Sequence, residues 1–254
     1  MPTWTPDALS SERRRLAGTC WRVVESQHRI STLKIVDTLA EQARLEELLE
    51  ESKPPLPPEC SHLHYLLATP FRYGAPYPHG SRFRRAGHTP GVFYASRTPV
   101  TAIVEAAFHR LLFFVDSPGT PWPDNPGEYT AFSVRYRTHA GLDLTAAPFD
   151  GDRPVLTDPT DYAACHALAD AARAGAIDAL RYPSARDPGP PAGVNVALLT
   201  CAAFASREPL ERHTWRILVG SAGVRAICTF PDIRLEFPRD VFARDPRIAE
   251  YPLR

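Results

Sequence analysis

The stretch Gly91-Val-Phe-Tyr-Ala-Ser-Arg-Thr-Pro-Val-Thr-Ala-Ile-Val-Glu-Ala-Ala-Phe108 joins two different local patterns. Gly91–Ala95 is a compact apolar segment, which is typical of a short buried strand. Pro99 then stands where a first helical residue is favoured, and an apolar helical pattern continues to Val115. We therefore expect a strand over 91–95 that is followed directly by a helix over 99–115.

Strand and helix patterns alternate irregularly through the following residues. The alternation within Tyr129–Arg137 predicts a half-buried strand, and the alanine-rich segment Asp161–Ala174 predicts a helix that Gly175 ends. Further strands are expected at 179–182, 194–199 and 224–230. This mixture has no internal repeat and predicts an α+β fold rather than a regular βαβ series.

The N-terminal part has a different character. Residues 1–18 are a polar lead-in, and apolar residues between Trp21 and Glu51 recur at three- and four-residue steps, which predicts helix. The segment Lys53-Pro-Pro-Leu-Pro-Pro58 ends that helix. We predict a helical N-terminal extension over residues 1–58 and a mixed body over 59–254.

Composition excludes several classes of protein. The 254 residues are 44% hydrophobic and 23% charged, and 29 basic residues balance 29 acidic ones, which gives no sign of a nucleic-acid or membrane-surface partner. Only two basic residues are lysines, so 29 − 2 = 27 are arginines. The five cysteines lack CxxC spacing and no apolar run is long enough to span a membrane, so we expect reduced thiols and a cytoplasmic location.

Two familiar ligand motifs are absent and a third is weak. The chain has neither GxGxxG nor GxxxxGK[ST], so a dinucleotide fold or P-loop has no support. The segment Cys60-Ser-His-Leu-His64 matches no zinc-site spacing, so we expect no metal.

A loop that follows residue 71 gathers basic and aromatic side chains. Guanidinium groups bind phosphates in a forked geometry, and aromatic faces stack on bases or a nicotinamide ring. The loop therefore suits an anionic or dinucleotide ligand, although a solvated basic loop is the alternative. The residues concerned are Arg72, Tyr73, Tyr77, His79, Arg82, Arg84 and Arg85.

Glu105 is an isolated charge on the apolar helical stretch. A carboxylate there either points to solvent or faces a cleft, where it must be paired or used. Its position just after the strand that carries Tyr94 favours the cleft. Ser184 stands beside Arg181 and Arg186, where it could bind a ribose hydroxyl or a phosphate, or form a plain turn. It lacks the Gly-x-Ser-x-Gly context of a nucleophile.

In their order along the chain, these segments resemble the RES domain, a family named for its Arg, Glu and Ser. The resemblance covers about residues 62–230, and the N-terminal helical segment resembles the extension of longer RES proteins. It implies a fold similar to that of ADP-ribosyltransferases, a mixed split sheet with flanking helices that grips NAD. The matching segments are Arg72-Tyr73, Gly80-Ser-Arg82-Phe83, Gly91-Val-Phe-Tyr94-Ala-Ser96, Ala102-Ile-Val-Glu105-Ala-Ala107, Leu180-Arg-Tyr-Pro-Ser184-Ala-Arg186 and Gly193-Val-Asn195.

The resemblance also implies an activity and partners. RES proteins are typically toxins of bacterial RES–Xre toxin–antitoxin pairs. They degrade NAD as a phosphorylase, with phosphate as co-substrate, or as a glycohydrolase with water. A mono-ADP-ribosyltransferase that modifies a host protein and a nucleotide-binding module without turnover are the alternatives. We accordingly expect NAD as substrate rather than cofactor, an Xre-type antitoxin as partner and, as a further possibility, a homo-oligomer.

Site residues follow from the resemblance position by position. It implies that Glu105, Arg72 and Tyr94 are catalytic and that NAD is bound by Arg72, Tyr73, Arg82, Tyr94, Ser184 and Asn195. Short RES toxins often have Gly-Gly-Arg-Trp-Asn where this chain has Gly80-Ser-Arg-Phe-Arg84. This departure leaves open which of Arg82, Arg84 and Arg85 contacts the ligand.

Overall fold

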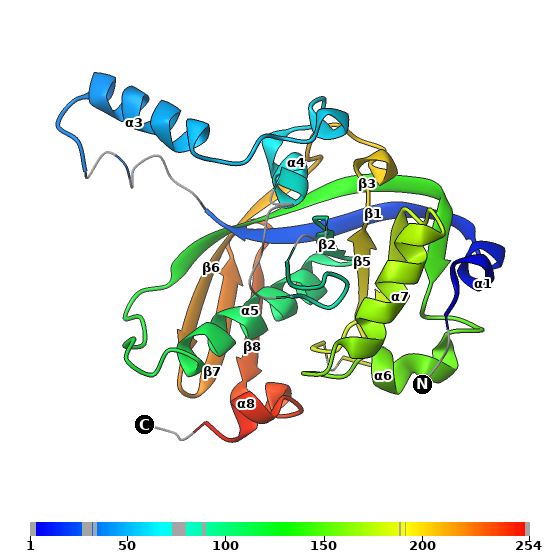
Figure 1. Cartoon of the computed structure of the whole chain (residues 1–254). Helices are drawn as coiled ribbons and strands as arrows, with labels where there is room; N and C mark the ends of the chain where they lie inside the picture. The colour runs from blue at the N-terminus through cyan, green and yellow to red at the C-terminus, as the bar shows by residue number, and fades with distance from the viewer. Residues whose placement is uncertain are drawn as a thin grey trace.

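The sheet of this protein is mixed, and helices flank it on both sides (Figure 1). The computed structural model describes residues 4–26, 32, 35–72, 80–87, 90–187, 189–190 and 192–251. Within these residues eight strands run in the order β1-β2-β5-β4-β3-β6-β7-β8. They are β1 (Arg14–Glu25), β2 (Phe93–Ser96), β3 (Gly127–Asp143), β4 (Ala179–Pro183), β5 (Val194–Leu198), β6 (Arg212–Gly220), β7 (Gly223–Cys228) and β8 (Ile233–Pro238). The α+β prediction is confirmed.

Two long antiparallel strands, β1 and β3, form the spine of the sheet. One edge of β3 pairs with β1 along almost its whole length. The other edge is divided, because β6 pairs with residues 127–132 and β4 pairs, in parallel, with residues 141–143. The sheet therefore splits into two halves, as predicted. In one half, the pairing of β2 with β1 at Trp21 and Ser96 closes a ring of strands, β1–β3–β4–β5–β2, and we call this part the ring half. The other half, which begins with β6, is the open half.

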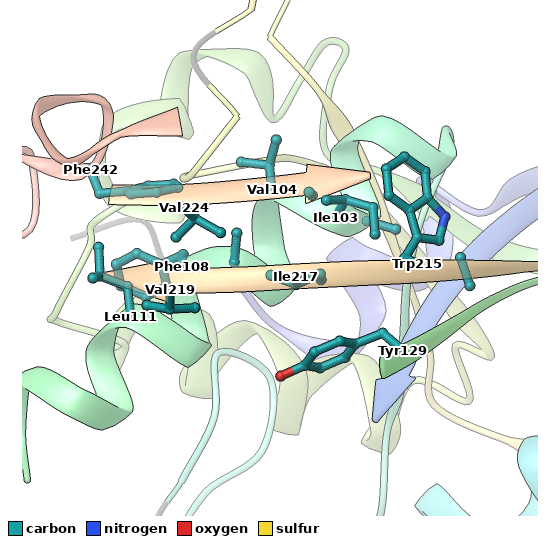
Figure 2. Close-up of a cluster of buried hydrophobic side chains, with 14 of the residues drawn as sticks. Ile103, Val104, Phe108, Leu111, Tyr129, Trp215, Ile217, Val219, Val224 and Phe242 are labelled. Atoms are coloured by element: carbon teal, nitrogen blue, oxygen red, sulfur yellow. The ribbon is translucent and has the colours of Figure 1, made fainter. Parts of the chain in front are cut away.

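Helix α5 (Pro99–Val115) has the bounds that the sequence predicts. The Thr98 side chain accepts a hydrogen bond from the backbone N–H of Thr101, and Pro99 occupies the first turn, so both N-terminal signals are satisfied. Figure 2 shows apolar side chains of this helix, among them Phe108 and Leu111, gathered against those of β6 and β7. This cluster fixes α5 across the open half of the sheet.

The remaining helices lie along the edges of the sheet and over its ring half. α7 (Ala163–Ala174) shares a core with β4 and β5, whereas α3 (Leu39–Glu51) extends away from the body (Figure 1). None of the described helices is long and apolar enough to cross a membrane. The others are α1 (Pro6–Ser11), α4 (Tyr65–Arg72), α6 (Arg153–Leu156), α8 (Pro246–Ala249) and the 3₁₀ turns η1 (Pro58–Cys60), η2 (Asp150–Asp152), η3 (Cys201–Ala203) and η4 (Arg239–Phe242).

The predicted strands at 91–95, 129–137, 179–182, 194–199 and 224–230 correspond to β2, β3, β4, β5 and β7, and the helix at 161–174 corresponds to α7. Gly175 caps that helix as expected. Strands β6 and β8 lie in segments for which the sequence predicted no element. Helix α4 continues through Pro70, although a proline ordinarily breaks or kinks a helix.

The N-terminal prediction is wrong in one respect and right in another. Residues 14–25 form β1 in the centre of the sheet, so a boundary at residue 58 would divide the sheet. The buried Leu16 follows two arginines, and three exposed residues separate it from the buried Cys20, so the strand alternation is obscured. Helix α3 does form, with a capping box between Thr38 and Glu41, and it ends before the proline-rich segment.

The expectation of reduced thiols is also corrected. Cys60 and Cys201 form a disulfide that joins η1 to η3, with Cα atoms 5.7 Å apart, whereas Cys20, Cys165 and Cys228 are free and buried. The two partners are 141 residues apart in the sequence, so spacing carried no signal of their proximity. Among the described residues, no group of three or more potential metal ligands occurs.

We predict that Leu16→Ala destabilises the fold and that Leu39→Ala does not. Leu16 on β1 is 1% exposed and packs in a cluster of buried hydrophobic side chains of the ring half. Its truncation should therefore lower the free energy of unfolding by about 2–5 kcal/mol. Leu39 on α3 is 75% exposed, and the same truncation should change stability by less than about 0.5 kcal/mol. Urea denaturation measures both, and equal effects would contradict the assignment of β1 to the core.

Candidate functional site

A cavity of about 520 Å³ opens between α5 and the strands β1, β2 and β5. This volume lies within the range of small-molecule sites. Four arginines and one glutamate are among its lining residues, which favours an anionic ligand. The wall consists of Trp21, Arg22, Val23, Gly80, Ser81, Arg82, Tyr94, Ala95, Ser96, Ala102, Glu105, Ala106, His109, Leu112, Tyr162, Tyr182, Ala185, Arg186, Asn195 and Arg247.

Glu105 lies on the face of α5 that borders this cavity. Residues three, four and seven positions apart on a helix share one face, and Ala102, Ala106, His109 and Leu112 line the cavity with it. The prediction that Glu105 faces a cleft is confirmed.

The carboxylate of Glu105 is held through one of its two oxygens. Oε1 accepts a hydrogen bond from Ser184 Oγ at 2.7 Å and another from Asn195 Nδ2 at 2.5 Å. The Asn195 amide is oriented in turn by Ser96, whose hydroxyl donates to Asn195 Oδ1 at 2.7 Å. No described residue donates a hydrogen bond to Oε2 of Glu105, so this oxygen is available to a ligand.

Ser184 supports Glu105 from behind the cavity wall. Its side chain is buried, and Oγ accepts hydrogen bonds from the backbone N–H groups of Arg186 and Asp187 at 3.1 and 3.0 Å. These two donors direct the single hydroxyl proton toward Glu105. Ser184 is therefore a positioning residue in this structure and not part of the wall.

Tyr94 connects β2 to the loop 80–87. Its hydroxyl accepts a hydrogen bond from the backbone N–H of Phe83 and shares a second one with Ser81 Oγ, both at 2.9 Å. Burial raises the pKa of the Tyr94 hydroxyl, so the phenol stays protonated. The side chain thus lines the cavity and fixes the loop that bears Arg82.

The structure separates the three arginines of that loop. Arg82 lines the cavity, and its guanidinium donates to the backbone oxygens of Leu156 and Asp158 at 2.7 and 2.9 Å. Arg85 instead forms an ion pair with Asp170 at the surface, and Arg84 is buried outside the cavity wall. Arg82 is thus the one of the three that is placed to reach a ligand in the cavity.

Arg72 is not in the cavity wall, which corrects its expected place in the site. Because α4 continues through Pro70, Arg72 lies beside the last turn of α3 and the segment that follows it, where it pairs with Glu50 and donates to the Pro54 carbonyl, each at 2.5 Å. Tyr73 lies outside the described residues, so its predicted role stays a prediction.

Several wall residues were not predicted as site residues. Arg22, on β1, donates to the Tyr94 carbonyl at 2.8 Å, and burial lowers the pKa of its guanidinium to about 10. It was missed because β1 was not recognised. His109 lies one helical turn from Glu105, a spacing that could have identified it. Burial lowers the pKa of the His109 imidazole; the Glu105 carboxylate opposes this effect, and nearby arginines such as Arg186 reinforce it.

We predict that Gly193→Ala destabilises the fold. A Cβ at this position would overlap Asp187 and Thr101, whose side chains are hydrogen-bonded to each other at 2.7 Å. The variant should lose about 1–3 kcal/mol of stability in thermal or urea denaturation. Gly151→Ala is the matched control, since nothing lies within 4 Å of the added Cβ. A fully stable Gly193→Ala protein would show that this close approach is not required.

Comparisons with known proteins bear on the family. A chain of the crystal structure of the M. tuberculosis MbcT–MbcA toxin–antitoxin complex matches with a TM-score of 0.43 and 14% identity, over 76% of this chain and 80% of that chain. No curated protein is significantly similar in sequence. The model of the RES domain family matches residues 56–219, more than half of the chain. The chain belongs to the RES domain family.

Proposed function

We propose that this protein cleaves the bond between nicotinamide and ribose in NAD. The observation that carries the proposal is the Glu105 carboxylate, which is fixed through Oε1 by Ser184 and Asn195 while Oε2 has no partner among the described residues. It borders a cavity that also contains arginine and tyrosine side chains. Membership of the RES family supports the same substrate, because the resemblance implies NAD degradation.

The chemistry requires a fixed negative charge beside the ribose. Departure of nicotinamide leaves positive charge on the ribose ring, as in the oxocarbenium-like transition state of glycoside hydrolysis. A carboxylate that is already oriented stabilises this charge without reorganisation during the reaction. The free oxygen of Glu105 supplies the charge, and it can also orient the hydroxyl of the acceptor. Nicotinamide leaves with the bonding electron pair, and the acceptor oxygen forms the new bond to the ribose carbon.

The remaining wall residues suit the other parts of NAD. The Arg82 guanidinium lies over the Tyr162 ring, 4.7 Å from its centroid, so it presents a fixed cation toward the pyrophosphate. Tyr94 and Trp21 provide aromatic surface for the nicotinamide or its ribose. Ser184 and Asn195 position the Glu105 carboxylate through hydrogen bonds, and Asn195 also lines the cavity.

The acceptor is phosphate or water in this proposal, and a toxin role follows from the family. Arg186 and Arg247 line the cavity, and both also pair with Asp245. Their cationic groups favour an anionic acceptor such as phosphate. Within the proposal, the protein is the toxin of a toxin–antitoxin pair, and an Xre-type antitoxin is its partner. Incubation with NAD, with and without phosphate, identifies the acceptor: phosphorylated ADP-ribose, free ADP-ribose, or a modified protein.

We predict that Glu105→Gln lowers the rate of nicotinamide release by at least about 10²-fold, because the amide cannot stabilise the cationic ribose. The fold should be retained, because Gln preserves the side-chain shape and the acceptor oxygen for Ser184 and Asn195. Nicotinamide is measured by chromatography, and circular dichroism checks the fold.

The matched control is Glu236→Gln, at an exposed position of β8, which should leave the rate unchanged. Full turnover by the Glu105→Gln variant would overturn the assignment of Glu105. Absence of nicotinamide release from the unaltered protein would favour the alternative of a nucleotide-binding module.

A further inference from the structure

A second cavity, of about 340 Å³, lies on the ring half of the sheet. It is lined by residues 17–19 of β1 and by Arg97, Tyr136, Arg181, Val194 and Val196. The edge of β1 beside it is paired with β2 only at Trp21, so among the described residues the ring is least closed at this place. The volume is near the lower limit of small-molecule sites and exceeds the need of a single inorganic ion.

The two cavities are on opposite faces of the same strands. Successive side chains of a strand point to opposite faces. On β4, Tyr182 lines the first cavity and its neighbour Arg181 lines the second. On β5, Asn195 lines the first cavity, whereas Val194 and Val196 line the second. A ligand of the second cavity would therefore be separate from one that contacts Glu105.

The second cavity presents two guanidinium groups. Arg181 is held in place by an ion pair with Asp143 at 3.0 Å and by a contact of 3.4 Å to the Tyr136 hydroxyl. Arg97 is exposed, and its side chain has no hydrogen bond or ion pair to any described residue; only its backbone N–H is engaged, with the Val194 carbonyl. Because Asp143 offsets one of the two positive charges, the cavity retains a net positive charge.

The rest of the lining is apolar or aromatic. Val196 is 1% exposed and Tyr136 is 4% exposed, and Gly18 lies against the Tyr136 ring, where an added Cβ would stand 3.6 Å from it. These surfaces favour a compact hydrophobic or aromatic group rather than a bare ion.

We propose that this second cavity binds a small organic anion. Its phosphate or carboxylate group contacts Arg97 and Arg181, and its compact body rests against Tyr136, Val194 and Val196. Guanidinium groups bind both kinds of anion through charge-assisted hydrogen bonds, so they recognise the shared negative charge. The proposal is independent of NAD cleavage, because no residue of the second cavity lines the first.

Crystals of the full chain soaked in 4-bromophenyl phosphate, and separately in 4-bromobenzoate, test the location. The anomalous signal of bromine should appear in the second cavity with at least one of the two compounds, with the anionic group toward Arg97 and Arg181. The compound that binds identifies the preferred anion. Bromine density in the first cavity alone, or at neither place, would overturn the proposal.

Isothermal titration calorimetry with the same compounds tests binding in solution. Arg97→Ala should remove one binding site per chain or weaken it at least about tenfold, since a hydrogen-bonded charge is lost. This variant should fold normally, because the Arg97 side chain has no described partner. Arg225→Ala, at an exposed position of β7, is the matched control and should bind as the unaltered protein does. Binding at soaking concentration only, or an unchanged Arg97→Ala isotherm, would contradict the proposal.

Discussion

The two hydrogen bonds that Ser184 and Asn195 donate to Oε1 of Glu105 are the interaction on which the site depends. They join helix α5 to the hairpin of β4 and β5 and fix a carboxylate in a position that borders a cavity. A carboxylate placed there without partners would be costly, and one that used both oxygens internally would have none for a ligand. The arrangement satisfies one oxygen and leaves the other accessible.

The split of the sheet creates the space that this carboxylate faces. Because β6 and β4 share one edge of β3, the strands diverge into two halves. The open half, which begins with β6, packs on α5, and the ring carries Asn195. Strand β1 spans both halves and contributes Trp21 and Arg22 to the wall. This strand lies outside residues 56–219, the part that matches the family model, yet the fold and the cavity both require it.

Sequence patterns identified the parts whose signals are local. The N1 proline and the apolar run predicted α5 with its observed bounds, and the position of Glu105 just after a strand indicated that it faces a cleft. Relations between distant segments could not be predicted. The strand pattern around Leu16 on β1 is obscured by the arginines that precede it. The position of Arg72 depends on a helix that continues through Pro70, and the disulfide of Cys60 depends on the tertiary fold.

A crystal structure of the Glu105→Gln variant with NAD bound shows whether the reacting ribose lies beside residue 105. We expect the nicotinamide ribose within hydrogen-bonding distance of the side chain at position 105, with the pyrophosphate toward Arg82. We also expect Ser184 and Asn195 to hold that side chain as they hold Glu105. NAD bound at another surface, or in this cavity with its nicotinamide ribose remote from position 105, would show that Glu105 does not act on the ribose.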